Sequence, residues 1–405
     1  MPDSHIDPTV NPGGLDPAFG ENSSGIIAVP GGSGLIRGLV QDGDAFVCAI
    51  SKAGEVWLHR ILPNGEADEK FGQGGVAKWR YPPEPGQPYQ LVPQGLIRQP
   101  DGKFLVLATS ITGGTPGPKI FFTRFNPSGS PDLVFSTRQV NTPIGHDNIS
   151  LSGVQYAYAP DGKILIAVNS LSIGVEGYIN FTVVHRFLAD GAIDTTFGEG
   201  SGFVKVLPKG GVKGDAIAVL RDGKILVGGV AANESKMLIA CLLPNGEVDL
   251  AFGDDGYWKG PSASYGATLL VRDDRIFWLG IVGDGYFKVA VIKVAANGKV
   301  DPEFNDGKAM VVDIPADFPG HLVMAVGLIQ ADGKLVVAGS AGFDDNAYWL
   351  RIEAEGGLDL SFGNGGIVTY EQISEVKAIV LDAEANRMVA AVNLNRRAKI
   401  FGIKN

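Results

Sequence analysis

Seven aspartates recur in this sequence within the pattern Gly-x-x-Asp-x-x-Phe, and these repeated carboxylates are the first feature that could carry chemistry. The copies are Gly13/Asp16/Phe19, Gly65/Asp68/Phe71, Gly129/Asp132/Phe135, Gly191/Asp194/Phe197, Gly246/Asp249/Phe252, Gly298/Asp301/Phe304 and Gly356/Asp359/Phe362. Carboxylates bind Ca²⁺, but a calcium loop stacks several oxygen ligands at alternate positions, whereas each copy here guarantees one Asp. We therefore expect a structural turn. In this turn the Gly takes a positive φ, the Asp caps backbone N–H groups and the Phe packs between repeat units.

A cation stands five residues before the motif Gly in five of the seven copies. These cations are Arg60, Arg124, Arg186, Lys293 and Arg351, and the other two positions hold Cys241 and Gly402. Two hypotheses are open: a set of cations that binds an anion, or a structural ion pair between each cation and its motif Asp. We favour the ion pair. Its loss should cost about 3–5 kcal/mol if the pair is buried and about 0–1 kcal/mol if it is exposed.

Two histidines and two cysteines are the other candidate ligands or nucleophiles. His59 and His185 precede two of these arginines, where the other copies hold Thr, Ala, Ile, Leu or Phe. We interpret them as histidines at the edge of the core rather than as metal ligands. Cys48 and Cys241 lie in apolar runs and are expected to be buried thiols. The sequence contains no His-Glu-x-x-His, Gly-x-Ser-x-Gly, Walker or Cys-x-x-Cys pattern, and we expect no metal and no cofactor.

A second repeated pattern, Asp-Gly-Lys, lies between the copies of the first. It occurs at residues 101–103, 161–163, 222–224 and 332–334. Asp-Gly between apolar runs predicts a β-hairpin, with a type I′ turn that places both central residues at positive φ. A third strand then leads into the Gly-x-x-Asp-x-x-Phe turn, and a fourth short strand follows that turn.

The Gly-x-x-Asp-x-x-Phe motif recurs with a mean period of about 57 residues, the length of a supersecondary unit that cannot bury its apolar faces alone. Seven units of four antiparallel strands predict an all-β fold, a seven-bladed β-propeller. The alternative is a β-solenoid, whose coils are usually shorter. The last strand, 398–404, lacks a motif after it, and the first motif lacks a strand before it. We therefore expect the strand at 25–29 to complete the last blade and close the ring.

This interpretation assigns residues 1–12 to an N-terminal extension and residues 13–405 to one propeller domain. The predicted blades cover approximately residues 35–80, 91–141, 152–207, 214–260, 266–313, 322–370 and 375–404, the last with 25–29 added.

The sequence pattern of the repeats resembles that of a known bacterial family. Pro63-Asn64-Gly65, Pro244-Asn245-Gly246-Glu247-Val248-Asp249 and Ala331-Asp332-Gly333-Lys334-Leu335-Val336-Val337-Ala338-Gly339 carry the resemblance. They are similar to the delta-60 repeat, and the resemblance covers nearly the whole chain beyond residue 12. It implies a β-propeller. That family has no established general function, so the resemblance implies no catalytic residues.

Composition limits the classes of partner. The net charge of −10 disfavours nucleic acid and anionic membranes, which need a basic face. With 45% hydrophobic and 19% charged residues, the chain can bury a large core. It has no apolar run of the length that spans a membrane. The N-terminus does not resemble a Sec signal, so we expect a protein that is cytoplasmic or exported without such a signal. We also expect a monomer.

Function is expected where the repeats differ from one another. In a four-stranded antiparallel blade, alternate connections emerge at opposite ends. The two repeated turns therefore share one end, here called the motif end, and the connections that vary in length share the other, the variable-loop end. Loops that diverge on a rigid scaffold commonly carry binding residues. The candidate binding residues of the variable-loop end are Trp79, Tyr81, Tyr89, His146, Asp147, Tyr178, Tyr286, Asp317, His321, Asp344 and Asp345.

We expect these aromatic side chains to be exposed, and exposed aromatics beside acidic residues suit a non-enzymatic scaffold that binds a protein or carbohydrate ligand. One alternative is a hydrolase or lyase with at least two acidic or His side chains converging at the mouth of the central channel. The other is a structural module of a larger assembly.

Overall fold

The computed structural model of the chain describes residues 12–31, 34–80, 90–111, 119–141, 148–174, 177–263, 265–282, 288–314, 322–341 and 346–405. The described residues form 28 β-strands and two short 3₁₀ helices, Glu21–Ser23 and Asn305–Gly307. Among them, none of the helices has the length and apolar character that crossing a bilayer requires.

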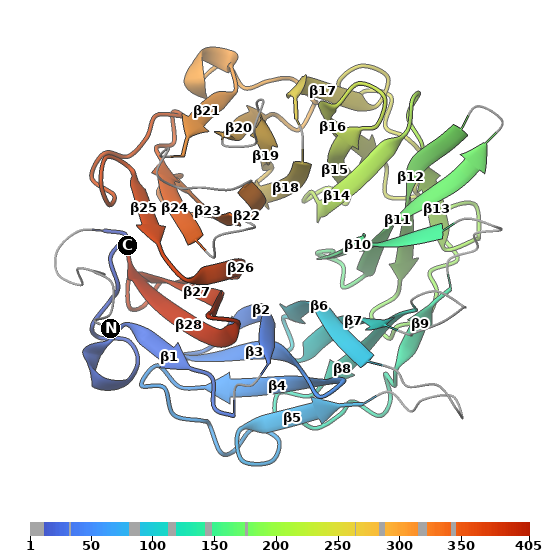
Figure 1. Cartoon of the computed structure of the whole chain (residues 1–405). Helices are drawn as coiled ribbons and strands as arrows, with labels where there is room; N and C mark the ends of the chain where they lie inside the picture. The colour runs from blue at the N-terminus through green and yellow to red at the C-terminus, as the bar shows by residue number, and fades with distance from the viewer. Residues whose placement is uncertain are drawn as a thin grey trace. The chain divides into compact units, whose positions relative to one another are not determined.

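The strands pair into seven four-stranded antiparallel sheets, as the sequence predicted (Figure 1). We number these sheets as blades in chain order. Blade 1 contains β2 (Leu35–Asp42), β3 (Ala45–Lys52), β4 (Glu55–Ile61) and β5 (Val76–Trp79). Blade 2 contains β6 (Gln90–Arg98), β7 (Phe104–Ile111), β8 (Ile120–Phe125) and β9 (Arg138–Val140). Blade 3 contains β10 (Asn148–Tyr158), β11 (Ile164–Gly174), β12 (Gly177–Phe187) and β13 (Phe203–Val206).

The remaining blades repeat the same order. Blade 4 contains β14 (Val212–Val219), β15 (Ile225–Ala231), β16 (Lys236–Leu242) and β17 (Tyr257–Ser262). Blade 5 contains β18 (Tyr265–Arg272), β19 (Arg275–Val282), β20 (Lys288–Val294) and β21 (Met310–Asp313). Blade 6 contains β22 (Leu322–Ile329), β23 (Leu335–Ala341), β24 (Asn346–Ile352) and β25 (Ile367–Tyr370). Blade 7 contains β26 (Ile373–Asp382), β27 (Arg387–Leu394), β28 (Arg397–Lys404) and, from the other end of the chain, β1 (Ile26–Ala28).

The pairing of β1 with β28 confirms that the N-terminal strand completes the last blade. Ile26 lies opposite Phe401, and a further bridge joins Leu15 to Ile403. The N–H of Asp16 donates to the carbonyl of Gly402 at 2.8 Å. The two ends of the sequence therefore share the hydrogen bonds that a continuous chain makes in the other blades.

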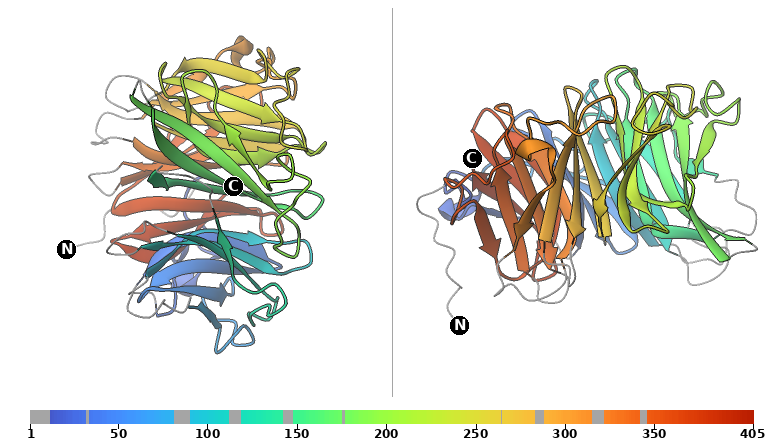
Figure 2. Two further views of the ribbon diagram at one scale, coloured as in Figure 1. Left: turned by 90° about the vertical axis from the view of Figure 1, so that its right-hand side faces the viewer. Right: turned by 90° about the horizontal axis from the view of Figure 1, so that it is seen from above.

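The chain divides into two compact units. One contains blades 1, 2 and 7 with most of blade 6, and the other contains blades 3 to 5. Within each blade the strands lie side by side and twist, as Figure 2 shows. Buried apolar side chains from neighbouring blades form the core; for example, Trp258 of blade 4 belongs to the same cluster as Trp278 of blade 5.

The Asp-Gly-Lys hairpins form where they were predicted, but the predicted turn type is wrong. In blade 2 the carbonyl of Gln99 accepts from the N–H of Gly102 at 2.9 Å, and the amide of Gln99 donates to Lys103 at 2.8 Å. Gly102 alone has a positive φ, of 82°, and Asp101 does not. The loop has three residues, one more than a type I′ hairpin loop. In such a loop only the last residue, here Gly102, must take the left-handed conformation.

Candidate functional site

The motif end is built by an ion pair within every blade. In six copies the N–H of the motif Asp donates to the carbonyl of the residue eight positions earlier, and in the first copy the N–H of Asp16 donates to the carbonyl of Gly402 in β28. Each motif Asp therefore lies beside the strand position that holds the cation in five of the copies. The five predicted pairs form, with N···O distances of 3.2 Å for Arg60–Asp68, 2.8 Å for Arg124–Asp132, 2.8 Å for Arg186–Asp194, 2.7 Å for Lys293–Asp301 and 2.7 Å for Arg351–Asp359. The structural hypothesis for these cations is therefore confirmed.

The two copies without a cation on the preceding strand receive one from the hairpin turn instead. Lys224 of the Asp-Gly-Lys turn lies 2.9 Å from Asp249, which is also within reach of the Cys241 thiol. Arg387 lies 2.9 Å from Asp16. Lys103 and Lys334 make the same contact in two blades that also have the arginine. Every motif carboxylate thus faces a cation of the chain, and these contacts place the two repeated turns together.

Each motif Asp also caps its own turn. Its Oδ1 accepts a backbone N–H two or three residues later, as Asp194 does from Thr196 at 3.0 Å. Burial alone would raise the pKa of Asp132, but hydrogen bonds from Lys103, the Phe135 amide and Arg124 outweigh burial and lower it to about 2. The Asp132 carboxylate is therefore held ionised, as a structural counter-ion requires.

The motif Phe and the Gly around it join one blade to the next. Phe71 of blade 1 meets Phe104 of blade 2 edge to face, with ring centroids 5.8 Å apart. The N–H of Gly72 donates to the carbonyl of Ser128 in blade 2 at 2.7 Å, and Gly198, Gly253, Gly363 and Gly20 make equivalent bonds to Asn245, Asn297, Pro12 and Pro63. A Cβ on Gly298 would lie 2.3 Å from the amide nitrogen of Gly253, so this approach requires glycine.

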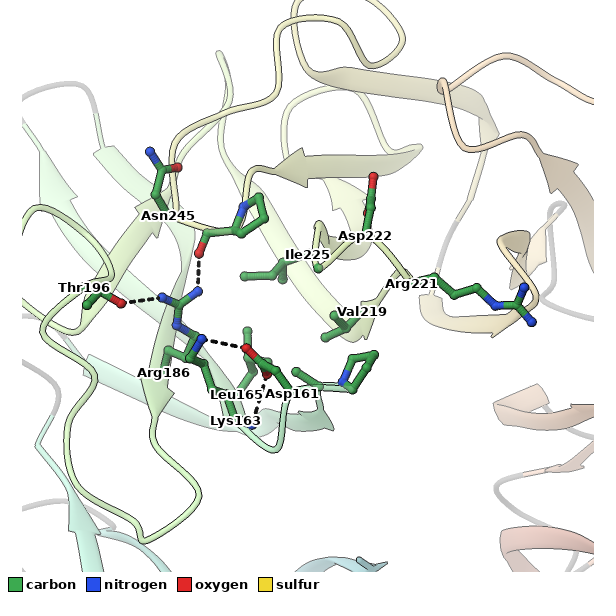
Figure 3. Close-up of a pocket in the computed structure, with 14 residues that line it drawn as sticks. Asp161, Lys163, Leu165, Arg186, Thr196, Val219, Arg221, Asp222, Ile225 and Asn245 are labelled. Atoms are coloured by element: carbon green, nitrogen blue, oxygen red, sulfur yellow. Dashed lines mark hydrogen bonds and ion pairs between the residues drawn. The ribbon is translucent and has the colours of Figure 1, made fainter. Parts of the chain in front are cut away.

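A recess of about 450 Å³ opens at the motif end between blades 3 and 4 (Figure 3). Its polar lining comes from the hairpin turns of both blades and from the motif turn of blade 3, and includes Asp161, Lys163, Arg186, Arg221 and Asp222. Its apolar lining includes Ala159, Leu165, Val219, Ile225 and Pro244. Both blades belong to the same compact unit.

Arg186 forms one wall of this recess and is fixed from several sides. Its Nε donates to Asp194 at 2.8 Å, its Nη2 donates to Thr196 at 3.2 Å, and its Nη1 donates to the carbonyl of Pro244 in the next blade. The ring of Phe197 lies 4.3 Å from the guanidinium carbon. Asp161 on the rim is paired with Lys163 at 2.6 Å. Burial alone would raise the pKa of Asp161, but the hydrogen bonds from the Lys163 ammonium and N–H together with the charges of Lys163 and Arg186 lower it.

A second charged cluster lies at the inner edges of blades 7 and 1. Glu375 of β26 is 2.9 Å from Lys377 and 3.3 Å from Arg37 of β2, and it accepts from Asn393 Nδ2 at 2.8 Å. Arg37 and Lys377 are the extra residues at β-bulges, which re-aim side chains. Burial lowers the pKa of Lys377. The cluster places one carboxylate between two cations, a different arrangement from the paired acids that the enzyme alternative predicted.

The histidines and cysteines lie in the core, as expected. His59 and His185 are buried, and burial lowers the pKa of each imidazole to about 4, with Lys52 and Lys78 adding to the effect at His59. Cys48 and Cys241 are buried free thiols, and burial raises the pKa of each to about 12. In the part of the chain that the structure describes, no group of three or more His, Cys, Asp and Glu side chains is arranged to hold a metal ion.

The structure gives different outcomes for the predicted binding residues. Trp79 is only 6% exposed and packs in the core of blades 1 and 2, so the expectation that it is an exposed aromatic is wrong. Trp79 alternates with exposed Lys78 at the end of β5, and the period of two turns the indole inward. Tyr178 lies in β12. The other predicted residues lie outside the described residues: Tyr81, Tyr89, His146, Asp147, Tyr286, Asp317, His321, Asp344 and Asp345.

One aromatic side chain at the variable-loop end was missed in the sequence. Trp57 follows the β3–β4 turn and is partly exposed. The Lys52 and Lys78 ammonium groups lie 4.2 and 4.1 Å from its ring centroid, and its Nε1 donates to Glu55 at 3.0 Å. The sequence offered a clue in Lys52 and Glu55, which pair across the turn, because Glu55 stands two residues before the indole.

Comparisons with known proteins agree with this fold. A family model described as "Domain of unknown function (DUF5122) beta-propeller" matches residues 159–197, 220–252 and 330–362, each of which runs from an Asp-Gly-Lys turn to a motif Phe. None of the curated proteins compared with the chain matches it. The solved structure of the Dos1 propeller is similar over 92% of this chain and 79% of that chain, with 11% identity and a TM-score of 0.50.

Two other solved structures are similar at lower scores. The polysaccharide lyase Uly1 matches over 92% of this chain and 90% of its own, with 12% identity and a TM-score of 0.46. An uncharacterized protein from Listeria monocytogenes EGD-e matches over 92% and 95%, with 10% identity and a TM-score of 0.44. Identities this low concern the fold alone. Together with the seven four-stranded sheets, the Dos1 likeness defines the class: the chain is a seven-bladed β-propeller.

Proposed function

We propose that this propeller is a non-enzymatic scaffold of the delta-60 repeat type, which binds a protein or glycan through its variable-loop end. The observation that carries the proposal is Trp57, a partly exposed indole with two ammonium groups close to its ring at that end of blade 1. An aromatic face with polar neighbours suits both sugar rings and protein side chains. Tyr81 and Tyr89, which the sequence predicts for the same end, are its proposed partners.

The contacts at the motif end support a structural role for that end, which leaves binding to the variable-loop end. There, each motif Asp is bonded to a cation and to its own turn, and each motif Phe is buried. These groups stabilise the blades. The repeats have the same residues at these positions because every blade needs the same turn and ion pair. At the variable-loop end the connections differ in length, which is what ligand-specific loops require.

The experiment is a glycan array combined with a quantitative pull-down, first with the wild type and then with the triple variant W57A/Y81A/Y89A. The matched control is L133A, since Leu133 is 85% exposed at the motif end of blade 2. We expect the triple variant to lose at least ten-fold in affinity for the captured ligand, with an unchanged melting temperature. Equal binding by the triple variant, or loss of binding in L133A alone, would refute the assignment to the variable-loop end.

A further inference from the structure

The recess between blades 3 and 4 lies at the motif end and therefore has no part in the proposed function. At two other blade junctions a polar contact fills the corresponding place. Arg98 of blade 2 reaches Asp42 of blade 1 at 2.6 Å, and Gln41 of blade 1 reaches Asp382 of blade 7 at 3.4 Å.

The strand registers show which residues replace that bridge here. Val219 pairs with Ile225 as Arg98 pairs with Phe104, so Val219 occupies the position of Arg98. Ala159 follows Tyr158, which pairs with Ile164 as Gln41 pairs with Phe46, so Ala159 occupies the position of Asp42. Two short apolar side chains thus stand where an Arg–Asp bridge stands elsewhere, and the recess is the space that this bridge would take.

The walls of the recess are complementary to a flat, uncharged group. All three nitrogens of the Arg186 guanidinium are engaged within its plane, and Phe197 covers one face of it. The Arg186 side chain is 7% exposed, and it lines the recess across from Val219 and Ile225 with the part that these contacts leave open (Figure 3). A planar guanidinium stacks well on an aromatic ring.

The charges around the recess are balanced. Lys163 is paired with Asp161, Arg186 with Asp194, and Arg221 with Asp273. The carboxylates of Asp161 and Asp222 are 55% and 56% exposed at the rim, where they can accept hydrogen bonds. A charged ligand would have to compete with an existing ion pair, whereas a neutral hydrogen-bond donor would not.

We propose that this recess binds a neutral aromatic ring that carries a hydrogen-bond donor, of the phenol or indole type. Its volume of about 450 Å³ falls in the range of about 300–1,000 Å³ typical of ligand pockets, and a cavity of about 150 Å³ already accepts benzene. The ring stacks on Arg186 and packs on Leu165, Val219 and Ile225, while its O–H or N–H donates to a rim carboxylate. The ring is either a free small molecule or a Tyr or Trp side chain of a peptide.

The test measures binding of p-cresol and 3-methylindole to the full chain by ligand-observed NMR titration. Toluene lacks the donor, 4-methylcyclohexanol lacks the aromatic ring and benzoate carries a charge, so each removes one feature of the proposed ligand. We expect p-cresol and 3-methylindole to bind at least ten-fold more tightly than these three. The peptide acetyl-Gly-Trp-Gly-amide identifies the source: binding as tight as that of 3-methylindole assigns the recess to a side chain, and ten-fold weaker binding assigns it to a free molecule.

The decisive variant, A159D/V219R, introduces the Arg–Asp pair that Arg98 and Asp42 form between blades 2 and 1. We expect it to keep the wild-type melting temperature and to lose at least ten-fold in affinity for p-cresol. The second variant, V219F, fills the recess with a ring of the chain itself and should lose the same affinity even if A159D/V219R is unstable. The control L360R adds an arginine at an exposed motif-end position of blade 6 and should bind as the wild type does. Undiminished binding in V219F, or equal binding of benzoate and p-cresol, would overturn the proposal.

Discussion

Replacing Arg186 by Met tests whether the motif ion pair holds the blades together. The substitution keeps most of the stem and removes the charge. The Arg186 and Asp194 side chains are 7% and 2% exposed, so the variant leaves a buried carboxylate without its counter-ion. It also leaves the carbonyl of Pro244 in blade 4 without its donor.

Breaking a buried pair by removing one partner costs about 3–5 kcal/mol, and we expect R186M to lie in this range. The equivalent pair in blade 1 provides the matched control. Arg60 and Asp68 are 25% and 17% exposed, so R60M should cost about 1 kcal/mol. The double variant R186M/D194N keeps an acceptor for the turn amides and removes the unpaired charge, so it should be more stable than R186M alone.

Calorimetry and denaturant unfolding measure these differences. At about 2.1 cal/mol/K per residue, unfolding of the whole chain in one transition carries about 0.85 kcal/mol/K, so a loss of about 4 kcal/mol lowers Tm by about 5 °C. If R186M costs no more than R60M, or if R186M/D194N is less stable than R186M, the buried-pair reasoning is wrong.

Two further predictions concern other buried groups. Burial lowers the pKa of His185 to about 4, so between pH 6.5 and pH 4 the unfolded chain binds a proton that the folded chain does not. The contribution of His185 to stability should therefore fall by about 3 kcal/mol as the pH drops through this window. The variant H185F should show a flatter dependence in denaturant titrations at pH 7.0 and 4.5, and an unchanged slope would contradict the reasoning. The motif Phe197 is fully buried, so F197A should lower the free energy of unfolding by about 3–5 kcal/mol, whereas L250A, at a position 70% exposed, should change it little. Equal effects of the two substitutions would show that the motif Phe does not act as a joint.

Much of the scaffold could be predicted from the sequence because the same motif occurs seven times. The hairpins, the turn caps, the ion pairs and the completion of blade 7 by β1 all follow from residue types at fixed spacing. The turn type did not follow, because Asp-Gly is compatible with loops of different lengths and the extra residue before it decides which one forms. The inward direction of Trp79 was also missed, since an indole beside loop residues reads as exposed when its alternation with Lys78 is ignored.

The candidate sites depend on contacts between blades, which no single repeat contains. In the sequence, Val219 is one more apolar strand residue. Only the fold shows that Val219 and Ala159 of the neighbouring blade line the same recess, where another junction has an ion pair. In the same way, Lys224 and Arg387 replace absent strand cations only because the fold brings the hairpin turn to the motif turn. The sequence by itself determined the repeated joint and hence the architecture, because turns and hairpins are set by local backbone geometry. Only the tertiary structure decided which side chains meet across blades, because packing between distant segments depends on register and volume.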